Sequence, residues 1–332
     1  MIVYKLAKEK NLTSKDLIGV CKELGFVVKA QNKLNEDQLA AVLAKLEGEP
    51  LSQPEEPAVE QAEQMEAAVE ETPVAEPVKK EAVLVAESIS KNLVYVVSEC
   101  APFTRLGVLG TKTVEFIEST KKDGHTPTIF LPLYGSISDA FKKSMEWVMD
   151  IPVTIGGTIH RASVLKLVQD RVVYYFISND AFFGDRDGIY GYSDDVARFT
   201  FFNRAILTFL PLSGQRFDEV HLNDWHTSIF SLLLRVEYSS HDYYAAVKTV
   251  LNIHDLEHQG WCEAQSLTDV LGISHEYYEN GLTRMGNGVN LLKSGIETAD
   301  QIQLSSLSQA QMQHESHIQS GMVFILETKI AG

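Results

Sequence analysis

The chain has 332 residues, 45% of them hydrophobic, and a formal net charge of −16 at pH 7. This length and apolar content allow two domains with a sizeable core. The acidic balance argues against a nucleic-acid binder, because phosphate backbones select for clustered lysine and arginine. The three cysteines are far apart and form neither a close pair nor a disulfide framework, which favours the reducing cytoplasm. The residues from Met1 lack the long apolar core of a signal peptide, and the sequence has no apolar run of about 18 residues, so we expect no membrane span and no membrane partner.

Residues 1–46 carry the pattern of a small helical module. A helix start signal at Thr13–Asp16 is followed by apolar residues at helical spacing and then by Gly25, and a second start signal stands at Asn35–Gln38. This pattern resembles the small amino-terminal module of bacterial translation initiation factor two. We interpret it as a docking or spacer module without a catalytic role, and the resemblance implies no place in translation here.

Residues 47–90 have the composition of a disordered linker. Five prolines stand among many glutamates and alanines, with only Lys79 and Lys80 as counter-charge. Such a segment buries too little apolar surface to offset the entropy lost on ordering. We therefore expect disorder here and assign this segment no chemistry.

From residue 91 to residue 332 the patterns of strands and helices alternate. Helical patterns cover about 111–122 and 194–210. Apolar strand-like runs stand at 93–97, 128–131, 171–178, 219–221, 248–253 and 301–304. Strands alternating with helices predict a parallel sheet with helices on both faces, which is a Rossmann-like α/β domain.

Two polar motifs directly follow two of these predicted strands. They are His221–His226 and Asn252–Gly260, and both are rich in His and Asp. In open α/β sheets, ligands bind in the crevice at the carboxyl ends of the strands. The motifs therefore predict a sugar or nucleotide site at this edge of the sheet.

Five separated blocks between about residues 92 and 330 resemble bacterial glycogen synthases and plant starch synthases in residue type and in order. They are Ser98–Phe103 with Leu131–Gly135, Phe183–Gly191 with Ala197–Ala205, His221–Thr227, His254–Gly260, and Val289–Gly295 with Ala299–Asp300. The resemblance implies one half of a GT-B glycosyltransferase, a fold in which two Rossmann-like domains face each other across a cleft.

Members of this family transfer glucose from ADP-glucose to the end of an α-1,4-glucan with retention of configuration, without a metal or other cofactor. Their amino-terminal domain supplies most of the acceptor side, and their carboxy-terminal domain holds most of the nucleotide-sugar contacts. The present chain resembles only the first domain and ends about where the crossover to the second would begin. The resemblance therefore implies an α-1,4-glucan ligand and a separate chain that carries the donor-binding domain.

The resemblance assigns catalytic roles to Asp224 and His254. Asp224 matches a cleft aspartate whose carboxylate accepts hydrogen bonds from sugar hydroxyls, although Asp is also a preferred N-cap residue of helices. His254 matches a histidine beside the transferred glucose, where an imidazole binds a hydroxyl and stabilises charge. Asp255 replaces an asparagine of the family and brings a carboxylate to the substrate. Tyr190 matches an aromatic residue of the cleft, either contacting sugar or only packing its loop.

The glycine-rich segment after the first strand departs from the family pattern Lys-x-Gly-Gly-Leu. Arg105 keeps the positive charge of the lysine and Gly107 keeps the first glycine, so both are predicted substrate contacts. Val108 replaces the second glycine, and we expect its side chain to restrict both the φ angle and the approach of the backbone to phosphate. Thr111 replaces a carboxylate. These changes predict weakened donor binding.

Three functional hypotheses remain open at this stage. The domain is an intact glucosyltransferase half that works with a second chain, a non-catalytic glucan-binding or regulatory half-domain, or the product of a truncated or split synthase gene. Transfer needs donor, acceptor and catalytic group held together. We therefore expect no measurable synthase activity from this chain alone.

Overall fold

The computed structural model describes residues 91–313 and 320–331, together with four helical residues nearer the amino terminus, Val20, Cys21, Val42 and Lys45. The expected linker at 47–90 and the rest of the expected module at 1–46 lie outside the described residues. By its internal contacts the chain divides into two units.

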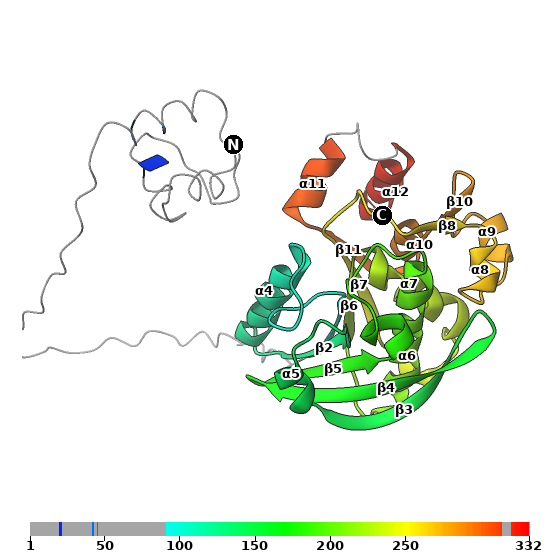
Figure 1. Ribbon diagram of the computed structural model, residues 1–332. Helices are drawn as coiled ribbons and strands as arrows, with labels where there is room; N and C mark the ends of the chain where they lie inside the picture. The colour runs from blue at the N-terminus through cyan, green and yellow to red at the C-terminus, as the bar shows by residue number, and fades with distance from the viewer. Residues whose placement is uncertain (1–19, 22–41, 43–44, 46–90, 314–319, 332) are drawn as a thin grey trace, which may run out of the picture. The chain divides into compact units, whose positions relative to one another are not determined.

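The first unit spans residues 1–81 and the second spans 82–332. The second unit is built on a mixed eight-stranded sheet with the order β11-β7-β6-β1-β2-β5-β4-β3 (Figure 1). Its parallel strands are β1 (Asn92–Val96), β2 (Thr126–Pro132), β5 (Val172–Ser178), β6 (Glu219–Asn223), β7 (Lys248–Ile253) and β11 (Gln301–Leu304). The predicted α/β fold with a parallel sheet is confirmed.

The order of these strands creates a crevice in the middle of the sheet. The chain starts at β1, builds β2 and β5 on one side of it, and then returns to place β6, β7 and β11 on the other side. The direction of winding therefore reverses between β1 and β6. Ligands bind at such a switch point in open α/β sheets. The first predicted polar motif follows β6, which borders the switch point, and the second follows β7, the next strand outward.

An antiparallel hairpin that the sequence reading missed extends one edge of the sheet. It consists of β3 (Glu146–Ile155) and β4 (Thr158–Gln169), joined by Gly156 and Gly157 at φ angles of 56° and 74°. Two adjacent residues with positive φ are typical of a two-residue hairpin turn, and glycine reaches this conformation without steric cost. The Gly-Gly pair was therefore a usable signal for the hairpin.

Helices cover both faces of the sheet (Figure 1). α4 (Leu109–Lys122) lies on one face, where Phe116 stacks on Tyr95 of β1. α6 (Asp195–Leu212), α7 (Asp224–Glu237) and α10 (Leu291–Thr298) pack side by side on the other face. The remaining elements are α5 (Asp139–Lys143), η1 (Asp180–Gly184), η2 (Asp242–Tyr244), α8 (Ser266–Asp269), α9 (Glu276–Glu279), α11 (Ser306–Gln313), α12 (Ser320–Ala331), β8 (Trp261–Glu263), β9 (Arg284–Met285) and β10 (Gly288–Asn290). No helix in the described part of the chain is long and apolar enough to cross a membrane.

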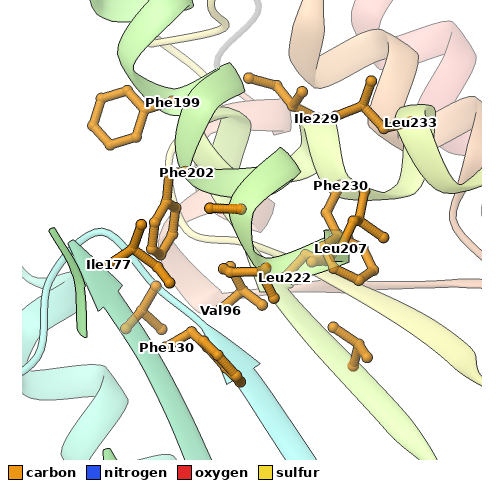
Figure 2. Packing of buried hydrophobic residues seen from close by; sticks show 14 of the residues in the cluster. Val96, Phe130, Ile177, Phe199, Phe202, Leu207, Leu222, Ile229, Phe230 and Leu233 are labelled. Atoms are coloured by element: carbon orange, nitrogen blue, oxygen red, sulfur yellow. The ribbon is translucent and has the colours of Figure 1, made fainter. Parts of the chain in front are cut away.

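The main core lies between the sheet and the layer of α6 and α7. Val96 and Leu222 of the central strands face Phe202 of α6 and Phe230 of α7, all of them buried (Figure 2). Burying one large apolar side chain contributes about 1.5–3 kcal/mol. This packing fixes the start of α7 at the carboxyl end of β6, which is where Asp224 lies.

Candidate functional site

A cavity of about 520 Å³ lies at the switch point of the sheet. Its walls come from the segments after β1, β5, β6 and β7 and from the start of α4. The lining residues are Glu99, Leu106–Leu109, Tyr190, Gly191, Asp195, Asp224–His226, His254, Asp255 and His258. Five of the six predicted site residues, Asp224, His254, Asp255, Tyr190 and Gly107, are therefore brought together.

Arg105 is the predicted site residue that the structure does not bring to this cavity. Its exposed side chain lines a separate surface depression beside α4, together with Thr111 and Lys122. The replacement of the family's carboxylate by Thr111 consequently also falls outside the cavity.

Asp224 is the first residue of α7 and adopts a left-handed backbone with φ of 56°. The N-cap position belongs to Asn223, and the Asp224 carboxylate turns instead to the loop after β7. There its Oδ1 accepts hydrogen bonds from the backbone N–H groups of His254 (2.7 Å) and Asp255 (3.2 Å). A left-handed residue other than glycine costs roughly 1–2 kcal/mol, and these two bonds offset that cost. The side chain therefore ties two segments of the site together and does not cap its own helix.

Burial raises the pKa of Asp224 to about 7. The N–H groups of His254 and Asp255 oppose this shift, while the nearby charges of Asp255 and Glu99 add to it. A carboxyl group that titrates near neutral pH can accept a hydrogen bond in one state and donate one in the other. Asp224 is thus able to bind a hydroxyl group or to exchange a proton with it.

The orientation of the His254 ring is set by Asn223. The ring Nε2 lies 3.0 Å from Asn223 Oδ1, and the Asn223 amide group donates to the backbone oxygen of Val96 at 3.2 Å. Because the amide oxygen only accepts, Nε2 carries the proton and Nδ1 is left as an acceptor. This Nδ1 is buried and has no hydrogen-bond partner among the described residues.

Burial, and next the charge of Lys112, lower the pKa of His254 to about 4. The ring is therefore neutral near pH 7 and offers a lone pair instead of a positive charge. A ligand hydroxyl that donates to Nδ1 would satisfy this buried atom, whose isolation otherwise costs free energy.

Asp255 and His258 form a pair at the rim of the cavity. Asp255 Oδ2 lies 2.5 Å from His258 Nδ1, and Asp255 Oδ1 accepts from the N–H of Glu257 at 2.8 Å. The His258 side chain is 76% exposed, so the pair faces solvent at the mouth. Asp255 therefore brings an anionic oxygen to the cavity at a position where a phosphate would meet repulsion.

Tyr190 also lines the cavity. Its hydroxyl donates to Glu99 Oε1 at 3.0 Å and lies 2.7 Å from Ser98 Oγ, while its ring contacts the imidazole of His226. Burial raises the pKa of this hydroxyl well above its usual value. Because the hydroxyl is held inside the protein, the ring is the part of Tyr190 that remains for a ligand.

Glu99 is a component of the site that the sequence reading missed. Its side chain is 2% exposed, and its Oε2 accepts from the N–H groups of Leu106 and Gly107 at 2.7 and 2.8 Å. Glu99 stands three residues after the end of β1. The rule that ligands bind at the carboxyl ends of parallel strands, which predicted a site after β6 and β7, applies to this position as well.

Val108 stands at the N-cap of α4 with φ of −70° and ψ of −33°, an ordinary helical conformation that any residue adopts. The position therefore does not need the backbone freedom of a glycine, and the expected effect of the side chain on the approach of a phosphate stays a prediction. The Val108 side chain is 59% exposed and lies in the cavity wall beside Leu106. Val108 therefore makes the wall more apolar without straining the chain.

Trp225 and His226 also line the cavity and were not predicted to be contacts. Burial, followed by the charge of His258, lowers the pKa of His226 to about 3, and its Nδ1 is buried without a partner among the described residues. Trp225 packs against Gly260, where an added Cβ would lie 2.4 Å from the ring. Gly260 has φ of 66°, so both the close approach and the backbone require glycine here.

Within residues 91–313 and 320–331, no group of three or more His, Cys, Asp or Glu side chains is arranged to hold a metal ion. The hydrogen-bonding groups in the cavity lining include the carboxyl of Asp224 and the imidazole of His254.

Comparison with known proteins relates this chain to starch and glycogen synthases. Residues 92–327 match the family described as starch synthase catalytic domain. The glycogen synthase of Clostridioides difficile (strain 630) is 33% identical over 211 residues, which is 63% of this chain and 44% of that protein. The glycogen synthase of Exiguobacterium sibiricum is 36% identical over 212 residues, or 63% of this chain and 44% of that protein.

A solved structure shows the same fold. It is the catalytic domain of starch synthase IV from Arabidopsis thaliana bound to ADP and acarbose, with a TM-score of 0.64 and 22% identity. The match covers 72% of this chain and 50% of that one, so this chain corresponds to about half of the catalytic domain. The fold, the five sequence blocks and the family match agree, and the chain belongs to the starch synthase catalytic domain family.

Proposed function

We propose that this domain binds the α-1,4-glucan acceptor in a glucosyl transfer whose donor, ADP-glucose, is held by a separate chain. The observation that carries the proposal is the chemistry of the cavity lining. Asp224 and His254 offer hydrogen-bond acceptors, and no described residue that lines the cavity is a lysine or arginine. Such a lining suits the hydroxyl groups of a neutral sugar better than the phosphates of a nucleotide.

The family membership supports the reaction assigned here. The matched relatives are glycogen synthases, and the related plant structure was solved with ADP and acarbose. In the proposed reaction Asp224 and His254 are the catalytic residues. Asp224 orients a glucan hydroxyl and exchanges its proton near neutral pH, and the neutral His254 ring accepts from a second hydroxyl.

The need for a second chain follows from the geometry of transfer. Holding donor and acceptor in line supplies roughly 7–11 kcal/mol of the barrier, and one domain provides only one wall. The rim of the cavity carries the exposed side chains of Leu106 and Val108, which supports coverage by an opposing protein surface.

We propose that the protein has neither a nucleic-acid partner nor a membrane partner. The unpaired cysteines support a reducing compartment, for which we propose the cytoplasm.

The second candidate function is a non-catalytic glucan-binding or regulatory half-domain. The same observation favours it, since a cavity without lysine or arginine among its described lining residues has no cation of its own for a donor phosphate. Both functions share the glucan site and differ only in whether transfer occurs with a partner.

Glucan binding is tested by titrating the full chain with maltotetraose at pH 8, where Asp224 is mostly ionised. Replacing Asp224 by Asn keeps an oxygen for the His254 and Asp255 N–H groups, but it turns the other carboxylate oxygen into a donor. Since a hydrogen bond to a charged group contributes about 1.5–3 kcal/mol, we expect Asp224→Asn to weaken binding about tenfold or more.

The matched control is Asp123→Asn, which removes one carboxylate at the exposed far end of α4. This variant should bind maltotetraose like the wild type. Absence of binding by the wild-type chain, or equal binding by the Asp224→Asn variant, would refute the glucan site.

A further inference from the structure

The segment between β1 and α4 presents two aliphatic side chains to the cavity, which we call the apolar wall. They belong to Leu106 and Val108, which are 68% and 59% exposed and line the cavity. The backbone that carries them is held in place. Glu99 Oε2 accepts from the N–H groups of Leu106 (2.7 Å) and Gly107 (2.8 Å), and the Val108 oxygen accepts from an N–H group of α4 at 3.0 Å. The apolar wall is therefore a fixed part of the cavity lining.

The apolar wall adjoins the polar groups of the proposed sugar site. Glu99 joins it to Tyr190, since the other carboxylate oxygen, Oε1, accepts from the Tyr190 hydroxyl at 3.0 Å. The helix that begins at the wall also reaches His254, because Phe116 of α4 lies against the imidazole with 5.7 Å between the ring centroids. A ligand whose hydroxyl group binds to His254 is therefore in the same cavity as the apolar wall.

A glucan alone does not match the apolar wall. Each glucose unit carries hydroxyl groups around its ring, and a hydroxyl placed against aliphatic side chains loses its hydrogen bonds to water without gaining others. An alkyl or aryl group in the same place removes apolar surface from water on both sides of the contact, which is favourable. Val108 makes this preference a property of this chain, because the family pattern has a glycine at this position.

We infer that the ligand of this cavity is a glucoside with an apolar aglycone, an alkyl or aryl group, which lies against the apolar wall while the sugar hydroxyls bind to Asp224 and His254. This inference rests on the proposed function and names a ligand class for the same site. The proposed acceptor is then a glucose unit or a short α-glucan attached to an apolar group. The opposing protein surface proposed above would cover this group together with the rim.

The inference is tested by titrating the full chain with two ligands that differ only in the aglycone, phenyl α-glucoside and methyl α-glucoside, and separately with maltotetraose. The wild-type chain should bind phenyl α-glucoside about tenfold more tightly than methyl α-glucoside, because the phenyl ring buries more apolar surface. The phenyl glucoside should also bind with the more negative change in heat capacity, which is the robust sign of apolar burial.

Variants of the apolar wall make the result specific. Replacing Leu106 and Val108 together by alanine should lower the ratio of the two affinities to about threefold or less. Val108→Thr replaces a methyl group with a hydroxyl group at nearly the same shape, so it should lower the ratio as well. The matched control is Val168→Ala, since Val168 is 60% exposed on β4 and lies outside the cavity lining. This control should keep the ratio of the wild type.

Thermal melting establishes which variants are folded, and if the double alanine variant is unfolded, Val108→Thr decides. Equal binding of the two glucosides by the wild-type chain would overturn the inference, and so would a folded wall variant that keeps the full ratio. Failure of the proposed function has a different signature. In that case the wild-type chain would not bind maltotetraose, whatever the comparison of the two glucosides shows.

Discussion

Asp224 links the start of α7 to the loop after β7, two segments that lie 30 residues apart in the chain. The link requires a left-handed backbone at an aspartate and a carboxyl group buried beside Asp255 and Glu99. Both features raise the free energy of the folded protein. Such features are typical of functional sites, where the surrounding structure over-determines a strained residue.

The raised pKa of Asp224 predicts how stability depends on pH. The folded carboxyl group has a pKa of about 7 against an ordinary value of 3.8, so the folded state binds more protons than the unfolded state between these two pH values. Stability contributed by this group is therefore present below about pH 4 and is lost as pH rises towards 7. The Asp224→Asn variant lacks this loss, which amounts to no more than about 4 kcal/mol.

This prediction is checked by urea unfolding of both proteins at pH 5 and pH 8. The free energy of unfolding of Asp224→Asn should increase relative to that of the wild type as the pH rises. Comparing the two proteins cancels the titration of His226 and His254, which is common to both. A difference that stays constant with pH would show that Asp224 titrates normally.

The sequence predicted that Asp224 and His254 lie together at the edge of the sheet because they follow predicted strands, and strand ends are visible in a sequence. Their catalytic roles stay a prediction. The position of Arg105 was predicted wrongly, and Glu99 was not predicted, for the opposite reason. Which way each points depends on how residues 105–107 fold back over the end of β1, and this path is set by tertiary hydrogen bonds to the Glu99 carboxylate.

At the scale of helices, the site depends on close packing of α7 and α10. Gly295 of α10 lies against Ser228 of α7, where an added Cβ would be 2.3 Å from the Ser228 Cβ. The Ser228 hydroxyl donates across this contact to the backbone oxygen of Leu291 at 2.8 Å. The contact holds α7, and with it Asp224, at a fixed distance from the segment that contains Gly260.

We expect Gly295→Ala to destabilise the protein by about 1–3 kcal/mol, because the new methyl group meets a side-chain atom that cannot rotate away. Urea unfolding measures the change. Gly321→Ala in α12 is the matched control, since its Cβ would meet only Met285 Cε at 3.5 Å. That change should be neutral or stabilising by up to about 1 kcal/mol, as expected for alanine in a helix. Equal effects of the two substitutions would contradict the close-packing argument.

The elements themselves were predictable to different degrees. β1, β2, β5 and β7 are mostly apolar runs buried on both faces, which is the clearest strand signal in a parallel sheet. The β3–β4 hairpin is half exposed, and its alternating pattern is interrupted by a register shift between Trp147 and Met149. Its recognisable signal was the Gly156–Gly157 turn.

At the scale of the whole molecule, the chain spans 44% of the length of each glycogen synthase compared here. It carries a sheet with its own core and a cavity at the switch point. The five sequence blocks predicted this family, because they fall on strand ends and on the helices α6 and α10, which a shared fold keeps in order. The need for a second chain stays a prediction, since it concerns a surface that lies opposite the cavity.

The most direct test of this need is transfer of labelled glucose from ADP-glucose to glycogen. The purified chain is assayed alone and together with a lysate of the cells from which it comes. The Asp224→Asn variant is assayed with the same lysate, and the lysate without added protein is the control. We expect no incorporation by the chain alone, incorporation above that of the lysate when the chain is added, and loss of this increase with the variant. Incorporation by the purified chain alone would contradict the account, because it would mean that one domain suffices to hold donor and acceptor.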